Sequence, residues 1–267
     1  MEIAGKHWPQ GGGLMLISDD KNNTKEISLP NERLRELMSN PLFFVLPEDT
    51  EPRKHSENID TLIGHKVNRI ERSLMEAYVP YFKEEEENSE IKHYKGTQTW
   101  IGLDPQALQT PYSDIHGALS LVQKYDPRTI IDLGAGYGRV GVVVEALLPD
   151  AEFIGYEILD ERIEEANRIF KYLKLSNCEM RKQNVLLDTF ELPEADVYFI
   201  YDFSDPDDVQ VILKQLSARI YRDRFFLIAR GKGIRSLIQV KFPEFWAAHG
   251  AKHENEWSLY SSFCDLV

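Results

Sequence analysis

Cysteine is scarce in this sequence, with only Cys178 and Cys264 among 267 residues. Two cysteines cannot build the disulfide framework of a small secreted domain or a four-cysteine zinc site. Long apolar runs are missing too, and the best one, over 140–148, is interrupted by Glu145. A membrane-spanning helix needs about 18 or more apolar residues in a row, so we expect no membrane association. The first residues also lack the basic and apolar regions of a secretion signal.

Basic charge is in short supply as well. Lys and Arg total 31 against 44 for Asp and Glu, which gives a net charge of −13. Binders of nucleic acids or anionic membranes need a positive surface, so this balance argues against both classes. The length predicts one large domain, or a domain with an extension of about 100 residues. The remaining expectation is a cytoplasmic enzyme or binding protein.

The composition changes near residue 95. Residues 1–95 are rich in charged and turn residues, and they predict helices over 31–38 and 59–78 with a proline-containing loop over 41–56. The second of these helices carries an apolar stripe that must be buried against something. We therefore predict a mainly helical N-terminal extension over 1–95 and a second domain over 96–267. The sequence carries no signal that indicates an oligomeric state.

Strand and helix patterns alternate from Thr110 onwards. Apolar runs predict strands over 129–133, 152–157, 178–181, 197–201, 224–229 and 257–263. Apolar residues at helical spacing predict helices over 113–124, 139–148, 160–173 and 209–220. Repeated strand–helix units of this length predict an α/β fold, namely a doubly wound and mostly parallel sheet with helices on both faces.

The strongest motif lies between the first predicted strand and the helix that follows it. Gly134, Gly136 and Gly138 alternate there, and glycines allow a tight turn and the close approach of a ligand to the backbone. The next strand ends in Glu157, which a doubly wound fold brings beside the glycine loop. An acid at that place can accept hydrogen bonds from both hydroxyls of a ribose. Together these features predict a nucleotide-like ligand.

Two side chains decide which nucleotide fits. A dinucleotide loop has a Gly or Ala three residues after its second glycine, and this chain has Arg139 there. Asp132, at the end of the first strand, would repel a diphosphate. It suits a ligand that carries an ammonium or sulfonium and no phosphate, as S-adenosylmethionine does. A nicotinamide-dependent oxidoreductase on a similar sheet is the alternative that these two residues argue against.

At this point the sequence resembles the class I, seven-strand S-adenosylmethionine-dependent methyltransferases, over roughly residues 110–267 with the motifs in 129–203. The resemblance implies that Asp132 lies near the methionine amino group, that Glu157 binds the ribose, and that Asn184 and Val185 contact adenine. Thr110 and Tyr112 match a segment that lies over the methionine part, and Tyr201 and Asp202 lie where the methyl group meets its acceptor. The implied cofactor is S-adenosyl-L-methionine. Its implied binding residues are Asp132, Gly134, Gly136, Gly138, Glu157, Asn184, Val185 and Thr110, and the candidate catalytic residues are Asp202, Tyr201 and Tyr112.

The methyl acceptor stays open between two classes. Nucleobase amino-methyltransferases usually carry Asp/Asn-Pro-Pro-Tyr/Phe after the fourth strand, whereas this chain has neither proline in 202–205, which argues against a nucleic-acid acceptor. The sequences at 110–112, 138–139 and 155–157 resemble the lysine methyltransferases of this fold, so a protein lysine or amine is one class. A small molecule is the other. A catalytically silent S-adenosylmethionine-binding protein is a further alternative.

The acids after the fourth strand have a structural interpretation. Asp205, Asp207 and Asp208 lie where the next helix needs an N-cap and first-turn acids. No second set of ligands accompanies them, so we predict no metal site.

The extension over 1–95 has two interpretations. It covers the acceptor opening as a lid, or it packs on the far side of the core and only stabilises it. All the predicted cofactor residues follow residue 95, so deleting 1–95 is expected to leave cofactor binding nearly intact.

Overall fold

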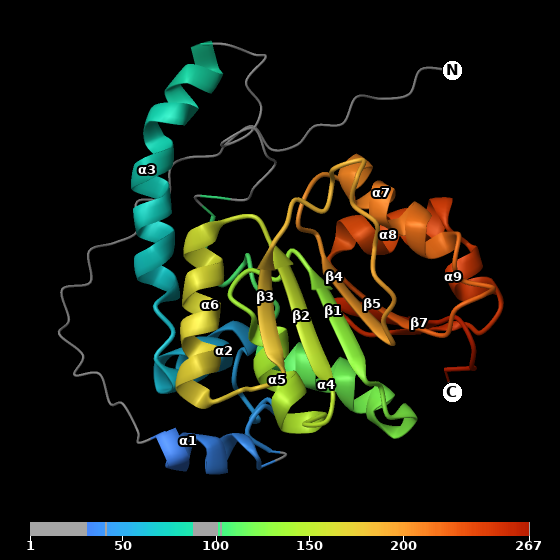
Figure 1. Cartoon of the computed structure of the whole chain (residues 1–267), viewed down its shortest axis with the longest axis horizontal. Coiled ribbons are helices and arrows are strands. Elements are labelled where there is room, and N and C mark those ends of the chain that lie inside the picture. The colour runs from blue at the N-terminus through green and yellow to red at the C-terminus, as the bar shows by residue number, and fades with distance from the viewer. Residues whose placement is uncertain (1–30, 41, 88–100, 102, 267) are drawn as a thin grey trace.

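The computed structural model describes residues 31–40, 42–87, 101 and 103–266. Seven strands form one sheet in the order β3-β2-β1-β4-β5-β7-β6 (Figure 1). Strands β1 to β5 are parallel, whereas β7 runs antiparallel to β5 and β6 antiparallel to β7. The strands are β1 (Thr129–Leu133), β2 (Glu152–Glu157), β3 (Cys178–Lys182), β4 (Val197–Tyr201), β5 (Phe226–Arg230), β6 (Ala251–His253) and β7 (Trp257–Ser261). The predicted doubly wound, mostly parallel sheet is confirmed.

Helices cover both faces of the sheet because the central strands are apolar on both sides. Ile130 of β1 packs into one core with α4 (Tyr112–Val122), α5 (Arg139–Leu147) and α6 (Asp160–Leu173). Its neighbour Ile131 points to the other face, where α7 (Pro206–Ser217), α8 (Lys232–Lys241) and α9 (Glu244–Ala247) pack. Strand side chains alternate between faces, so continuous apolar runs are typical of buried parallel strands. A short 3₁₀ helix, η2 (Gln123–Tyr125), follows α4.

The described residues of the N-terminal part form helices α1 (Asn31–Met38), α2 (Pro52–Ile63) and α3 (Val67–Glu87). The predicted single helix over 59–78 is wrong, because Gly64 adopts a left-handed conformation with φ of 76° and ends α2 there. Glycine favours this helix-ending conformation because it has no side chain to clash. The predicted loop over 41–56 also ends too late, since Pro52 begins α2 at a position where proline's missing N–H costs nothing.

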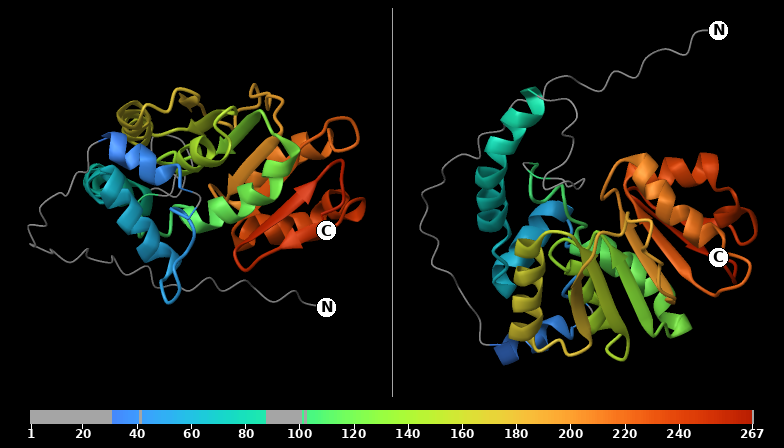
Figure 2. Two further views of the ribbon diagram at one scale, coloured as in Figure 1. Left: turned by 90° about the horizontal axis from the view of Figure 1, so that it is seen from below. Right: turned by 45° about the horizontal axis from the view of Figure 1, so that its top comes forward.

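The first two helices share the main core of the sheet. Buried side chains of this region, Leu34, Met38, Phe44, Ile59 and Ile63, belong to the same cluster as α4, α5 and α6. Helix α3 runs beside α6 and projects beyond it (Figures 1 and 2), and its Leu74 packs on Ile101 and Leu159. The predicted boundary at residue 95 lies outside the described residues and stays a prediction. Among the described helices, none combines the length and apolar character needed to cross a bilayer.

Candidate functional site

A cavity of about 370 Å³ opens at the carboxyl ends of β1, β2, β3 and β4. This is the edge at which open α/β sheets bind their ligands, and the volume lies within the range of small-molecule sites. The cavity brings together most of the predicted site residues: Gly134, Gly136, Glu157, Asn184, Val185, Tyr201 and Asp202. A small side cavity of about 30 Å³ at the glycine loop is lined by Asp132 and Thr110.

The three glycines of the loop have different neighbours, although all have positive φ. A Cβ on Gly134 would lie 2.4 Å from the Cβ of Phe203, and one on Gly138 would lie 2.7 Å from the Phe170 ring of α6. These two positions need glycine for packing within the protein. A Cβ on Gly136 would meet nothing within 4 Å. Gly136 therefore presents bare backbone to the open cavity, as a ligand-contacting position should.

Glu157 faces the glycine loop from the end of β2. One carboxylate oxygen accepts a hydrogen bond from the Gly136 amide at 2.9 Å, and the other accepts from the amides of Ile158 at 2.8 Å and Leu159 at 3.1 Å. A carboxylate offers about four acceptor sites, so these three donors leave one site, on the oxygen that also accepts from Gly136. The side chain is held in one orientation along the cavity wall and can still accept a hydrogen bond from a ligand.

Asp132 is a buried carboxylate at the end of β1, with an exposed fraction of 5%. Within the part of the chain that the structure describes, no group donates a hydrogen bond to it or forms an ion pair with it. Burial, and secondly the charge of Glu157, raise the pKa of Asp132 well above its ordinary value. An unpaired buried carboxylate beside a ligand cavity fits the ammonium group of a methionine moiety.

Hydrogen bonds to Arg139 and to α2 fix Thr110 and Tyr112, at the start of α4. The Thr110 carbonyl accepts a hydrogen bond from Arg139 at 3.2 Å. Tyr112 is fully buried, does not line the cavity, and donates its hydroxyl hydrogen to Asp60 of α2 at 3.0 Å. The structure therefore brings Thr110 to the side cavity that Asp132 lines. It places the side chain of Tyr112, a candidate catalytic group, against Asp60 of α2 and away from the main cavity.

Tyr201 and Asp202 lie at the end of β4, each with a partner. The Tyr201 hydroxyl donates to the Ala107 carbonyl at 2.8 Å, and the Arg230 guanidinium lies 4.4 Å from the ring centroid. The Asp202 carboxylate accepts from the amides of Gly233 at 2.9 Å and Ile234 at 2.7 Å, which caps the N-terminus of α8. Burial raises the pKa of Asp202, although these two hydrogen bonds oppose the shift.

Asn184 and Val185 follow β3 on the opposite wall. The Asn184 side chain accepts a hydrogen bond from the Leu186 amide at 3.0 Å, which shapes the turn. Val185 is buried, and with Ile158 and Leu186 it gives this end of the cavity an apolar lining. Such a surface suits a flat heterocycle.

Several cavity residues were missed by sequence reasoning. Leu103, Ala107 and Leu108 line the cavity from a segment without regular pattern, and no sequence signal singles them out. Lys232 and Glu256 come from the region after β5, where the structure has α8 and β6, two elements that the sequence analysis did not predict. Across the described ranges, no cluster of His, Cys, Asp and Glu side chains could hold a metal ion.

Comparisons with known proteins bear on the reaction class. Residues 126–218 match the model of a family described as a methyltransferase domain. No curated protein matches the chain.

Solved structures with a similar fold include three methyltransferases. A Bacillus cereus O-methyltransferase in complex with S-adenosylhomocysteine has a TM-score of 0.45 and 15% identity, over 57% of this chain and 81% of that one. A Podospora anserina methyltransferase bound to S-adenosylhomocysteine has a TM-score of 0.38 and 17% identity, over 48% and 56%. Human N-acetylserotonin methyltransferase in complex with S-adenosylmethionine has a TM-score of 0.44 and 14% identity, over 58% and 55%. The chain thus spans little more than half the length of the last two.

The matched segment begins just before β1 and ends just after α7, so it contains the glycine loop, Glu157 and the end of β4. The reaction class and the cofactor predicted from these residues are confirmed at this level. The matched segment, 126–218, with its glycine loop and its two acidic strand ends, is therefore a methyltransferase domain that uses S-adenosylmethionine.

Proposed function

We propose that the chain transfers the methyl group of S-adenosylmethionine to an amine, and that the acceptor enters at the Tyr201–Phe203 end of the cavity. The observation that carries this proposal is the lining of that end, where the carboxylates of Asp202 and Glu256 accompany the Phe203 ring. Carboxylates and aromatic faces both suit a cationic or amine-bearing group. Lys232 shares this wall and would disfavour an acceptor with a second positive charge close by.

When it is bound, S-adenosylmethionine supplies a methyl group activated by its sulfonium charge. The residues of this chain then act mainly by alignment and exclusion of water. Glu157 orients the ribose, Asp132 pairs with the ammonium, and Leu103 and Leu108 shield the cavity. An amine that arrives as an ammonium must lose a proton, and Asp202 is the candidate acceptor of that proton. Its raised pKa brings this carboxylate closer to the pH at which a general base works best.

A protein lysine is the acceptor that we place first, and a small amine second. The net charge of −13 favours the approach of basic peptides. The resemblance of residues 110–112, 138–139 and 155–157 to lysine methyltransferases of this fold also supports a lysine. The cytoplasmic location stays a prediction from the sequence.

The test uses the full chain and a methyl-labelled cofactor. Calorimetry with S-adenosylhomocysteine first establishes binding, and absence of binding would overturn the cofactor assignment. Transfer is then measured with lysine-containing basic peptides, small amines and phenols. We expect label on the amines, and transfer to phenols alone would refute the acceptor class.

Two variants test whether Asp202 itself is the general base. Asp202→Asn should lose turnover while keeping affinity for S-adenosylhomocysteine. Asp205→Asn, an exposed acid at the N-terminus of α7 three residues further on, should change neither property.

A further inference from the structure

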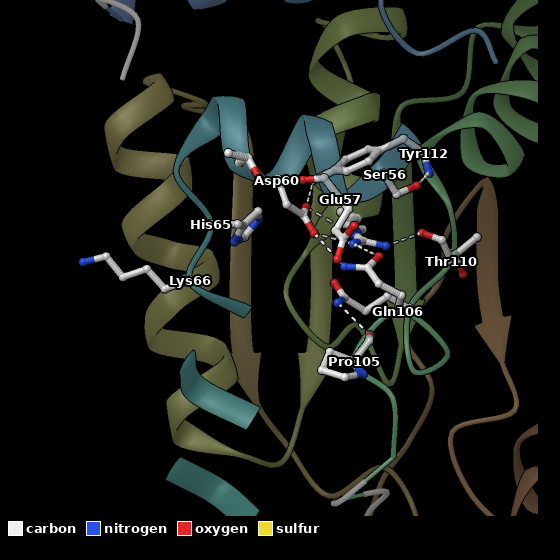
Figure 3. Close-up of polar contacts among 12 residues, drawn as sticks. Ser56, Glu57, Asp60, His65, Lys66, Pro105, Gln106, Thr110 and Tyr112 are labelled. Atoms are coloured by element: carbon white, nitrogen blue, oxygen red, sulfur yellow. Dashed lines mark hydrogen bonds and ion pairs between the residues drawn. The ribbon is translucent and has the colours of Figure 1, made fainter. Parts of the chain in front are cut away.

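Two buried ion-pair clusters join the N-terminal helices to the glycine loop. The first centres on Asp60 of α2, which pairs with Arg139, the residue directly after Gly138. The exposed fractions of Asp60 and Arg139 are each 4%. Arg139 also donates to the side-chain carbonyl of Gln106 at 2.8 Å and to the Thr110 carbonyl at 3.2 Å. Figure 3 shows Asp60 of α2, Gln106 and Thr110 of the segment before α4, and Tyr112 at the start of α4 lying close together.

The second cluster centres on Glu71 of α3, which is also buried. Its carboxylate accepts from the Tyr137 hydroxyl at 2.7 Å and from Arg162 at 2.9 and 3.2 Å. Tyr137 lies between Gly136 and Gly138, and Arg162 of α6 lines the cavity. Helix α3 is therefore attached to the loop at Tyr137, whereas α2 is attached at Arg139, directly after the loop.

These contacts connect the helices to parts of the cofactor site. Through Arg139, Asp60 fixes the stretch that supplies Ala107 and Leu108 to the cavity wall and Thr110 to the side cavity with Asp132. Through Tyr137, Glu71 fixes the glycine that presents bare backbone to the cavity. Stability alone does not explain such pairs, because apolar residues of similar volume are often as stabilising as a buried ion pair. A pair of directional charges does, however, hold its partners in one geometry.

We propose that Asp60 and Glu71 are positioning residues for cofactor binding, which set the glycine loop and the wall over 106–110 through Arg139 and Tyr137. The cofactor site is therefore completed by helices α2 and α3, which precede the methyltransferase motifs. The inference rests on the proposed cofactor site, and it reverses the expectation that residues 1–95 are dispensable for cofactor binding.

The mildest test is Tyr137→Phe in the full chain, which removes one hydroxyl and leaves the Glu71–Arg162 pair intact. Tyr198→Phe is the matched control, because Tyr198 is equally buried and donates its hydroxyl to the Pro193 carbonyl on the other face of the sheet. We expect Tyr137→Phe to weaken S-adenosylhomocysteine binding about fivefold and to raise the KM for S-adenosylmethionine more than it lowers kcat. Tyr198→Phe should lower the melting temperature similarly and leave both constants unchanged.

A second test replaces the first ion pair as a unit. Asp60→Leu combined with Arg139→Met keeps the site filled and uncharged, so the protein should still fold, as circular dichroism and melting would verify. It leaves the Thr110 and Gln106 carbonyls without their donor, and we expect about tenfold weaker binding of S-adenosylhomocysteine.

The outcomes distinguish a failure of the cofactor site from a failure of the positioning role. Wild-type protein that binds no S-adenosylhomocysteine would overturn the cofactor site itself. Wild-type binding together with unchanged affinity in both the Tyr137→Phe protein and the folded double variant would overturn only the positioning role.

Discussion

Asp132 gives the sharpest prediction, because its burial affects stability and binding in opposite directions. The carboxylate is 5% exposed and has no hydrogen-bond or ion-pair partner within the described part of the chain. Its pKa in the folded protein is raised by burial and by Glu157, whereas the unfolded chain ionises near the ordinary value of 3.8. The folded state thus holds this proton more tightly. The stability contribution of Asp132 is therefore fully present below that pH and is lost as the pH rises through the raised pKa.

Replacing Asp132 by Asn removes the charge and keeps the shape. An unsatisfied buried polar group costs about 1–3 kcal/mol, and the asparagine amide retains part of that cost. We therefore expect a gain of about 1 kcal/mol at pH 8, which raises the melting temperature by roughly 2–4 °C in a domain of this size. The gain should vanish near pH 4, where both proteins carry a neutral side chain.

The same variant should bind the cofactor poorly. The charge-assisted hydrogen bond to the ligand ammonium is worth about 1.5–3 kcal/mol, so affinity for S-adenosylhomocysteine should fall by about tenfold to a hundredfold. Wild-type affinity should itself decline as the pH falls, because the ammonium favours the ionised form of Asp132. Thermal melting across this pH range and calorimetry measure both effects. A variant that is less stable at every pH, or that binds as tightly as the wild type, would refute the reasoning.

Three further predictions follow from the same geometry. Glu157→Gln keeps the volume and one acceptor but loses the charge, so calorimetry should show about tenfold weaker S-adenosylhomocysteine binding, and unchanged affinity would contradict a ribose contact. Gly136→Ala and Gly64→Ala impose a similar left-handed strain of about 1 kcal/mol, and both added methyl groups point into open space. Only Gly136→Ala should also weaken cofactor binding, and equal affinity in both proteins would show that Gly136 is purely structural. Deletion of residues 1–95 removes Ile59 and other side chains of the main core and leaves Arg139 buried without Asp60, so we expect insoluble or molten protein by circular dichroism. A stable truncated protein that binds S-adenosylhomocysteine normally would argue against any role of the extension in the site.

Local patterns determined the architecture of the sheet in advance. The strands β1, β2 and β4 occupy the predicted residues because each is a short apolar run bounded by polar or turn residues. The glycine loop and the acid at Glu157 were recognisable because they stand at fixed distances from those strands. Apolar periodicity did not predict the break between α2 and α3, because the apolar stripe continues across Gly64, where α2 ends. It also missed β6, which has only three residues, and α8, although Ile234, Leu237 and Ile238 recur there at helical spacing.

Only the tertiary structure decided how the site is supported. Asp60 and Arg139 are 79 residues apart in sequence, and Glu71 and Arg162 are 91 apart. No spacing rule links such positions, because their pairing depends on how α2 and α3 pack against α4 and α6. The same holds for Asp202, whose place after β4 was visible in the sequence but whose hydrogen bonds to α8 required the fold. The sequence by itself therefore determined the fold and the ligand class, through periodicity and short motifs. The partners of each charged group depended on distances that only the packed chain establishes.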